Sequence, residues 1–213
     1  MAEPVAAVDD VAGLVRQACA GDREAFYVLV SRFERGLYRA ALAITRNPAD
    51  AEEVVQETFM RAFEHLASFR GDAKFQTWLT QIALNTARMK LRKNHGNLWE
   101  SLDEPRETDE GFVPRDVAEW RENPEERLGR EEREQLLHHA LNGLPPGYRE
   151  VVALRDIQML STQETADLLG MSVANVKTRL LRARLQLRER LAAQLGRRAA
   201  AGRVQNQIPA EAP

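Results

Sequence analysis

Residues 161–180 read STQETADLLGMSVANVKTRL. Ser161 followed three residues later by Glu164 is the pattern of a capping box, which starts a helix. Gly170 suits a tight turn that needs a positive φ, and Ser172 can cap a second helix. The segment therefore predicts two helices joined by a tight turn.

The second of these predicted helices has one apolar side and one polar, basic side. Its packing stripe consists of Val173, Val176 and Leu180. Projecting from roughly the opposite side are Lys177, Thr178, Leu181 and Arg182. A basic helix that is entered through a tight turn fits the major groove of DNA. An ordinary helical hairpin is the alternative interpretation.

The amino-terminal part of the chain predicts three further helices. Apolar residues recur there at spacings of three and four, which is the helical period. Asp22 can cap the first helix, and Asn47 followed by Pro48 can start the second. The third is expected from about residue 76 to 93, with these side chains inward: Trp78, Leu79, Ile82, Ala83 and Met89. Three amphipathic helices of this length predict a small bundle.

A change in composition separates this bundle from a second helical domain. Residues 97–124 are acidic, contain Pro and Gly, and show weak periodicity, so we expect a flexible acidic linker there. The predicted fold is all-α, with two small helical domains. The expected divisions are an N-terminal tail (1–20), a bundle (21–96), the linker (97–124), a helix-turn-helix domain (125–195) and a C-terminal tail (196–213).

The net charge of −2 conceals a strong segregation of charge. Residues 70–93 hold six basic side chains and one acid, and residues 170–203 hold nine basic side chains and one acid. Between them, residues 97–134 hold 14 acids and six basic side chains. Two basic segments suggest two contacts with a polyanion, although solvated helix faces explain the same pattern.

Several classes of protein are disfavoured. Cys19 is the only cysteine, which excludes a disulfide-stapled fold. Uncharged apolar stretches such as residues 76–87 are too short to span a membrane, which needs about 20 apolar residues. The N-terminus lacks a signal-peptide pattern, so we expect a cytoplasmic protein. The histidines show no metal or nucleophile spacing, so no metal, cofactor or catalytic residue is expected.

Four motifs in fixed order resemble the extracytoplasmic-function sigma factors of bacteria. They are DAEEVVQETF (50–59), FRGDAKFQTWL (69–79), LPPGYREV (144–151) and the helix-turn-helix that ends at Arg184. The resemblance covers about residues 21–195. It implies sigma region 2 in the first domain and region 4 in the second. It also implies a protein that is not an enzyme, but binds core RNA polymerase, directs it to −35/−10 promoters and assists their opening.

The resemblance assigns the second helix to the β′ clamp helices of the polymerase. The matching residues are Asp50, Glu53, Gln56 and Glu57. Carboxylates spaced by three and four on one helix face form an acidic stripe that suits a basic partner. A solvated face is the alternative. A carboxylate metal site is disfavoured, because the Glu-x-x-His partners of di-iron bundles are missing.

The resemblance assigns the next loop and helix to the −10 element. The residues are Phe69, Arg70, Lys74, Phe75, Trp78, Asn85, Arg88 and Arg92. Aromatic walls and cations are the groups that hold an unstacked base and its phosphates. Plain core packing remains an alternative for Phe75 and Trp78.

For the −35 element, the resemblance assigns these residues: Ser172, Lys177, Thr178, Arg179, Leu181, Arg182 and Arg184. It further implies contact with the polymerase β flap, and inhibition by an anti-sigma factor. The main rival class is a two-domain DNA-binding regulator whose first bundle senses a ligand or dimerises. Such a regulator would bind duplex DNA without polymerase.

Overall fold

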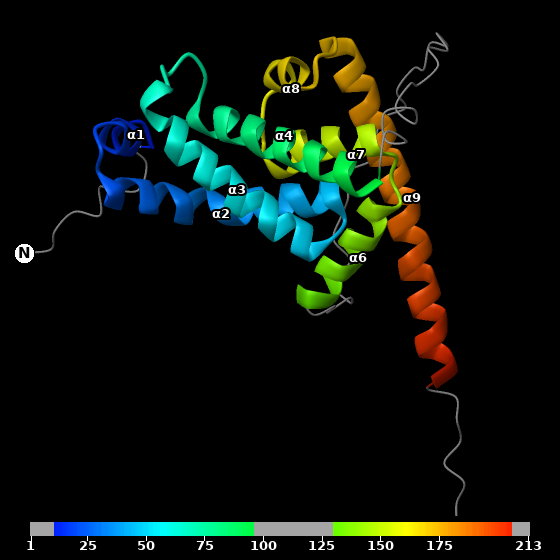
Figure 1. Ribbon diagram of the computed structural model, residues 1–213. Helices are drawn as coiled ribbons and strands as arrows, with labels where there is room; N and C mark the ends of the chain where they lie inside the picture. The colour runs from blue at the N-terminus through cyan, green and yellow to red at the C-terminus, as the bar shows by residue number, and fades with distance from the viewer. Residues whose placement is uncertain (1–10, 96–129, 206–213) are drawn as a thin grey trace, which may run out of the picture.

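The computed structural model describes residues 11–95 and 130–205, and this part of the chain is helical, without strands (Figure 1). The amino-terminal bundle consists of α1 (Val11–Cys19), α2 (Arg23–Thr45), α3 (Pro48–His65), the 3-10 helix η1 (Leu66–Ser68) and α4 (Phe75–His95). The carboxy-terminal unit consists of α6 (Arg130–Asn142), α7 (Pro146–Val152), the π-helix η2 (Ala153–Ile157), α8 (Thr162–Leu169) and α9 (Val173–Gln205). The all-α prediction is confirmed, and the predicted linker at 97–124 lies outside the described residues.

The first helices begin where their capping residues predict. Asp22 Oδ1 accepts the backbone N–H groups of Glu24 at 2.9 Å and Ala25 at 3.2 Å. Asn47 Oδ1 likewise accepts hydrogen bonds from two backbone N–H groups in the first turn of α3, which also contains Pro48. These side chains satisfy helix-end donors that have no partner within the helix.

The amino-terminal bundle packs α3 and α4 against α2, and α1 adds to it. Buried leucines and valines on all three long helices form the core: Leu29, Leu37, Val54, Leu79 and Leu91. The inward prediction for Met89 is wrong, since this side chain is 49% exposed and Leu84 and Leu91 occupy the buried side. Helix α1 lies in the predicted tail, yet its Val15 and Ala18 are buried against the bundle.

The carboxy-terminal unit is organised around α9. Helices α6, α7 and α8 all contact it, and its buried residues include Val176 and Ala183. Helix α9 continues to Gln205, ten residues into the segment that we expected to be a tail. Alanine and arginine are strong helix formers, and they dominate residues 197–203.

The two units pack directly against each other. Helix α2 contacts η2, α7 and α6. Buried apolar side chains of both units, from Val15 of α1 to Ala183 of α9, form one common core. Figure 1 shows α7 and α8 beside α4, with α9 extending away from the bundle. The sequence predicted two domains, but it did not predict this contact between them.

Candidate functional site

The helix-turn-helix forms through the predicted local interactions. Glu164 N–H donates to Ser161 Oγ at 3.1 Å, and Ser161 N–H donates to Glu164 Oε2 at 2.7 Å. Gly170 has a φ of 66°, in the left-handed region that favours glycine. Ser172 Oγ accepts the N–H of Asn175 at 3.2 Å at the start of α9. The capping box, the turn and the second cap are therefore confirmed.

Helix α9 places its apolar and basic side chains on different sides. Val176, Leu180 and Ala183 are buried in the carboxy-terminal unit. Exposed along the start of the helix are Ser172, Lys177, Thr178 and Arg182, with Arg179 and Leu181 half-buried beside them. This side of α9 is therefore an accessible, polar and cationic helix face. The major groove of B-DNA is wide enough to admit an α-helix.

Arg184 has a carboxylate partner that the sequence analysis did not identify. Its Nη2 donates to Asp156 Oδ1 at 2.6 Å and its Nε donates to Asp156 Oδ2 at 3.2 Å. These hydrogen bonds raise the pKa of Arg184 above its ordinary value. Asp156 lies 28 residues earlier, in the π-helix η2, so spacing alone could not reveal the pair.

The three aromatic side chains assigned to the −10 element form one cluster. The ring centroids of Phe69, Phe75 and Trp78 lie 5.1 to 5.7 Å apart. Phe75 is buried and also lies 5.7 Å from Phe33 of α2, so its ring belongs to the core. Phe69 and Trp78 are half-buried and leave part of their rings accessible.

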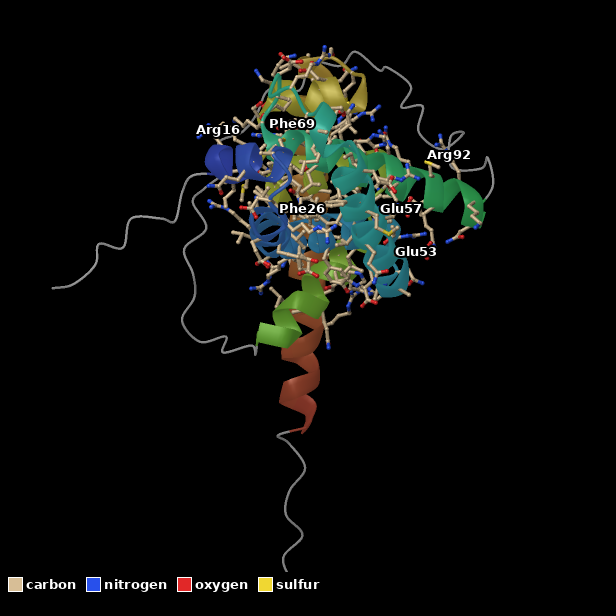
Figure 2. The ribbon with its side chains drawn as sticks, turned by 60° about the vertical axis from the view of Figure 1, so that its left-hand side comes forward. Arg16, Phe26, Glu53, Glu57, Phe69 and Arg92 are labelled. Atoms are coloured by element: carbon tan, nitrogen blue, oxygen red, sulfur yellow. The ribbon has the colours of Figure 1, made fainter. Side chains whose placement is uncertain are left out.

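The polar residues of the same set are distributed along α4 and the loop before it. Exposed side chains are found at Arg70, Lys74, Asn85 and Arg92. Phe69 and Arg92 mark the two ends of this region in Figure 2. Arg88 differs from the others, because it forms a two-pronged ion pair with Glu150 of the carboxy-terminal unit.

The predicted acidic stripe lies on the outer side of α3. Figure 2 shows Glu53 and Glu57 one above the other on this side. Glu57 accepts a hydrogen bond from Arg61 Nε at 2.7 Å. Gln56 is exposed and makes this surface part polar and part acidic.

Lys90 of α4 crosses to this stripe and was not predicted to do so. Its Nζ lies 3.5 Å from Asp50 Oδ1 and donates a hydrogen bond to the Glu53 carboxylate. That hydrogen bond lowers the pKa of Glu53 and raises the pKa of Lys90. Asp50 also accepts a hydrogen bond from Asn94 at 3.2 Å. Part of the acidic stripe is therefore already partnered by α4.

The described residues, 11–95 and 130–205, hold neither a metal-binding cluster nor a membrane span. No group of three or more His, Cys, Asp or Glu side chains in this part of the chain is placed to hold a metal ion. No helix there is long and apolar enough to cross a membrane.

Comparisons with known proteins agree with the two structural units. Residues 29–96 match the family described as Sigma-70 region 2, and residues 134–187 match Sigma-70, region 4. The RNA polymerase sigma-H factor of Pseudomonas aeruginosa is 33% identical over 175 residues, covering 80% of this chain and 88% of its own length. The ECF RNA polymerase sigma-E factor of Escherichia coli K12 is 35% identical over 173 residues, with the same coverage.

Two solved structures share the fold. CnrH, solved in complex with the cytosolic domain of CnrY, is 30% identical with a TM-score of 0.61, covering 87% of this chain and 99% of that one. The sigma factor RpoE from Bartonella quintana, solved with the anti-sigma factor NepR, is 24% identical with a TM-score of 0.58, covering 78% and 96%.

The helix-turn-helix, the helical bundle that precedes it and these relatives lead to one family. A sigma factor is a transcription initiation factor and not an enzyme. The chain belongs to the extracytoplasmic-function family of RNA polymerase sigma factors, which direct RNA polymerase to promoters.

Proposed function

We propose that three surfaces of this sigma factor divide the work of initiation, with region 2 in residues 21–96 and region 4 in residues 125–195. The observation that carries the proposal is the separation of charge on the surface. An acidic stripe lies on α3, whereas cationic side chains line α4 and the start of α9. Opposite charges suit opposite partners, a basic protein helix on one side and DNA phosphates on the other.

The α3 stripe binds the β′ clamp helices of core RNA polymerase. Glu53 and Gln56 are exposed, and Asp50 and Glu57 lie on the same helix one turn away. Their neighbours Lys90 and Arg61 already show that cations fit against this stripe. Exposed ion pairs are individually weak, so cations of a partner helix can replace them at low cost.

The loop before α4 and the helix itself bind the −10 element. Phe69 and Trp78 offer accessible ring surface on which an unstacked base can lie, while Phe75 supports them from the core. Arg70, Lys74 and Arg92 supply cations for the phosphates, and Asn85 offers an amide for a base edge.

The start of α9 reads the −35 element in the major groove. Lys177, Thr178, Leu181 and Arg182 face the bases, and Arg179, Arg184 and Ser172 contact phosphates. The carboxy-terminal unit also contacts the polymerase β flap. An Arg or Lys pairing with guanine O6 and N7 is the commonest specific contact of this kind.

Regulation involves an anti-sigma factor, and the protein acts in the cytoplasm together with RNA polymerase. CnrH is solved with the cytosolic domain of CnrY, and RpoE is solved with the anti-sigma factor NepR. A chain whose two DNA-binding units already touch offers one continuous surface that such a partner can cover in a single step.

Competition for core polymerase tests the α3 assignment. The variant Glu53→Gln/Glu57→Gln removes two negative charges from the stripe, and we expect it to bind core polymerase at least tenfold more weakly. The control Glu34→Gln removes an exposed carboxylate from α2 and should bind as the wild type does. Equal affinity of the double variant and the control would refute the assignment.

A further inference from the structure

A groove lies between α6 and the second half of α9. The two helices contact each other and diverge beyond that contact (Figure 1). Residues 139–143, at the end of α6, form one wall, and residues 189–197 of α9 form the other. The groove has a volume of about 530 Å³, which is within the range of pockets that hold small molecules. Most of its side chains are polar, so it suits a polar occupant.

The groove is distinct from the surfaces proposed for DNA. The residues of α9 proposed to contact DNA end at Arg184, and the match to region 4 ends at residue 187. The α9 wall of the groove begins only at Glu189. An inference about the groove therefore goes beyond the proposed function and does not rest on it.

Two arginines give the groove a positive charge. Arg190 and Arg197 are on the same face of α9 as Gln194, which lies four residues after the first and three before the second. Both arginines are exposed, and neither has an ion-pair partner in the described part of the chain. Glu189 is the one carboxylate among the described residues that line the groove. Guanidinium groups bind phosphates through paired N–H donors, so the groove suits an anion.

The spacing of the arginines favours an extended anion. Seven residues of α-helix rise by about 10.5 Å. A chain of phosphates can contact both guanidinium groups over this length, whereas a single phosphate is much smaller than the groove. The expected anion is therefore a polyphosphate.

Gly143 determines where one of these cations lies. A Cβ added to Gly143 would collide with the guanidinium of Arg190. The missing side chain thus leaves the space in which this guanidinium lies, next to the carboxyl end of α6. A positive charge is favourable there, because the last carbonyl groups of a helix carry partial negative charge. Arg190 is therefore held against the groove wall, ready to bind a ligand.

The groove continues along α6 into a smaller hollow of about 360 Å³. The two parts share His139, Gln194 and Arg197, and the smaller part adds Gln135 and Leu136. Leu136 is 8% exposed and provides an apolar floor. An imidazole ring such as that of His139 can stack on a nucleobase, and a carboxamide such as that of Gln135 can pair with its edge. This part suits a flat, polar heterocycle.

Two carboxamides between the helices have unused hydrogen-bonding capacity. Asn142 Oδ1 and Gln194 Oε1 are buried and have no hydrogen-bond partner. Asn142 Nδ2 lies 3.4 Å from Nδ1 of His138. Burial and the nearby charge of His139 lower the pKa of His138, so its neutral ring can accept this hydrogen bond. A buried acceptor without a partner is costly, and rotation of either carboxamide toward the groove would let a ligand N–H satisfy it.

We propose that this groove binds a nucleoside that carries two or more phosphates in a chain. Arg190 and Arg197 bind the phosphates, and the base lies on Leu136 beside the ring of His139. The ligand contacts α6 and α9 together, so its binding fixes the second half of α9 against α6. The site needs neither polymerase nor DNA.

Calorimetric titration of the full chain tests the proposal directly. The probes are ADP, GDP, inorganic pyrophosphate and adenosine, each added without polymerase or DNA. At least one of the two nucleotides should bind with a stoichiometry of one, and about tenfold or more tightly than pyrophosphate or adenosine, because each of these lacks half of the contacts. No binding of ADP or GDP at millimolar concentration would overturn the proposal. Pyrophosphate binding as tight as that of the nucleotides would overturn it too, since the base would then contribute nothing.

A pair of matched variants tests the role of charge. Arg190→Gln should weaken binding of the tighter nucleotide about tenfold, because a phosphate contact is lost. Arg188→Gln removes the same charge from the opposite side of α9, at an equally exposed position, and should bind as the wild type does. Circular dichroism checks that both variants are folded. Equal weakening by the two variants would indicate general attraction to a basic helix and contradict the site.

Photocrosslinking locates the bound nucleotide. The probe is the 8-azido derivative of whichever nucleotide binds more tightly, and cross-linked peptides are identified by mass spectrometry. The label should be found in residues 135–143 or 189–197. Labelling of α4 or of the first turns of α9 instead would place the nucleotide on the surfaces proposed for DNA and overturn the proposal, while leaving the proposed function intact.

Discussion

Glu164 shows how one side chain can serve both local and long-range structure. Its carboxylate closes the capping box with Ser161 and also accepts the hydroxyl of Thr77 from the other unit. The hydrogen bonds from Ser161, then that from Thr77 and the charge of Lys74, lower its pKa to about 2 from an ordinary value near 4.5. The capping box was visible in the sequence. The bonds to α4 were not, because Thr77 is 87 residues away.

The lowered pKa predicts how acid affects stability. The folded-state pKa lies below the unfolded one, so the stabilisation is complete above about pH 4.5 and is lost as the pH falls toward 2. Urea unfolding of the wild type and Glu164→Gln should show a difference in free energy that is constant near pH 7 and shrinks between pH 4.5 and 2. A difference that stays constant down to pH 2 would contradict the assignment.

Replacement of Arg182 tests the proposed recognition of the −35 sequence. Replacement by alanine should cost about 1–3 kcal/mol on the best −35 sequence and much less on other sequences, because the base contact proposed for Arg182 would be lost. Selection of −35 variants by the polymerase holoenzyme measures both values. Arg197→Ala removes an equal charge near the other end of α9 and serves as the control. Equal losses on all sequences for Arg182→Ala would indicate a phosphate contact.

Among the elements, the clearest predictions from sequence are those with local causes. The caps Asp22 and Asn47, the capping box and Gly170 depend on neighbours within four residues, and the structure has all of them. The burial of α1 and the exposure of Met89 depend on helices distant in sequence, and these were missed. The same reason explains why the partners of Arg184 and Lys90 were not predicted.

Two glycines, one that follows α8 and one within α9, should respond in opposite directions to replacement by alanine. Gly170 has a φ of 66° and ends α8, so Gly170→Ala should destabilise the protein by about 1 kcal/mol. Gly196 lies within α9 with nothing within 4 Å of an added Cβ, so Gly196→Ala should stabilise it by about 0.5–1 kcal/mol. Chemical denaturation measures both changes. Destabilisation by Gly196→Ala would contradict a helix through that position.

For the whole molecule, the order of motifs along the chain predicted the family and both structural units. What the sequence could not supply was their relative placement, because Arg88 and Glu150 are 62 residues apart and each also suits a solvated surface. Only the fold shows that the helix proposed to bind the −10 element is covered by the unit proposed to bind the −35 element. The residues proposed for DNA recognition on α4 therefore lie next to those that contact the carboxy-terminal unit.

The most direct test of the account is transcription with purified components. The protein is mixed with bacterial core RNA polymerase freed of sigma, and transcripts from fragmented genomic DNA are sequenced with and without it. We predict new start sites that share a two-part motif near −35 and −10, and their loss with the α3 variant Glu53→Gln/Glu57→Gln. No transcription and no association with core polymerase, together with tight sequence-specific binding of the free protein to duplex DNA, would contradict the account.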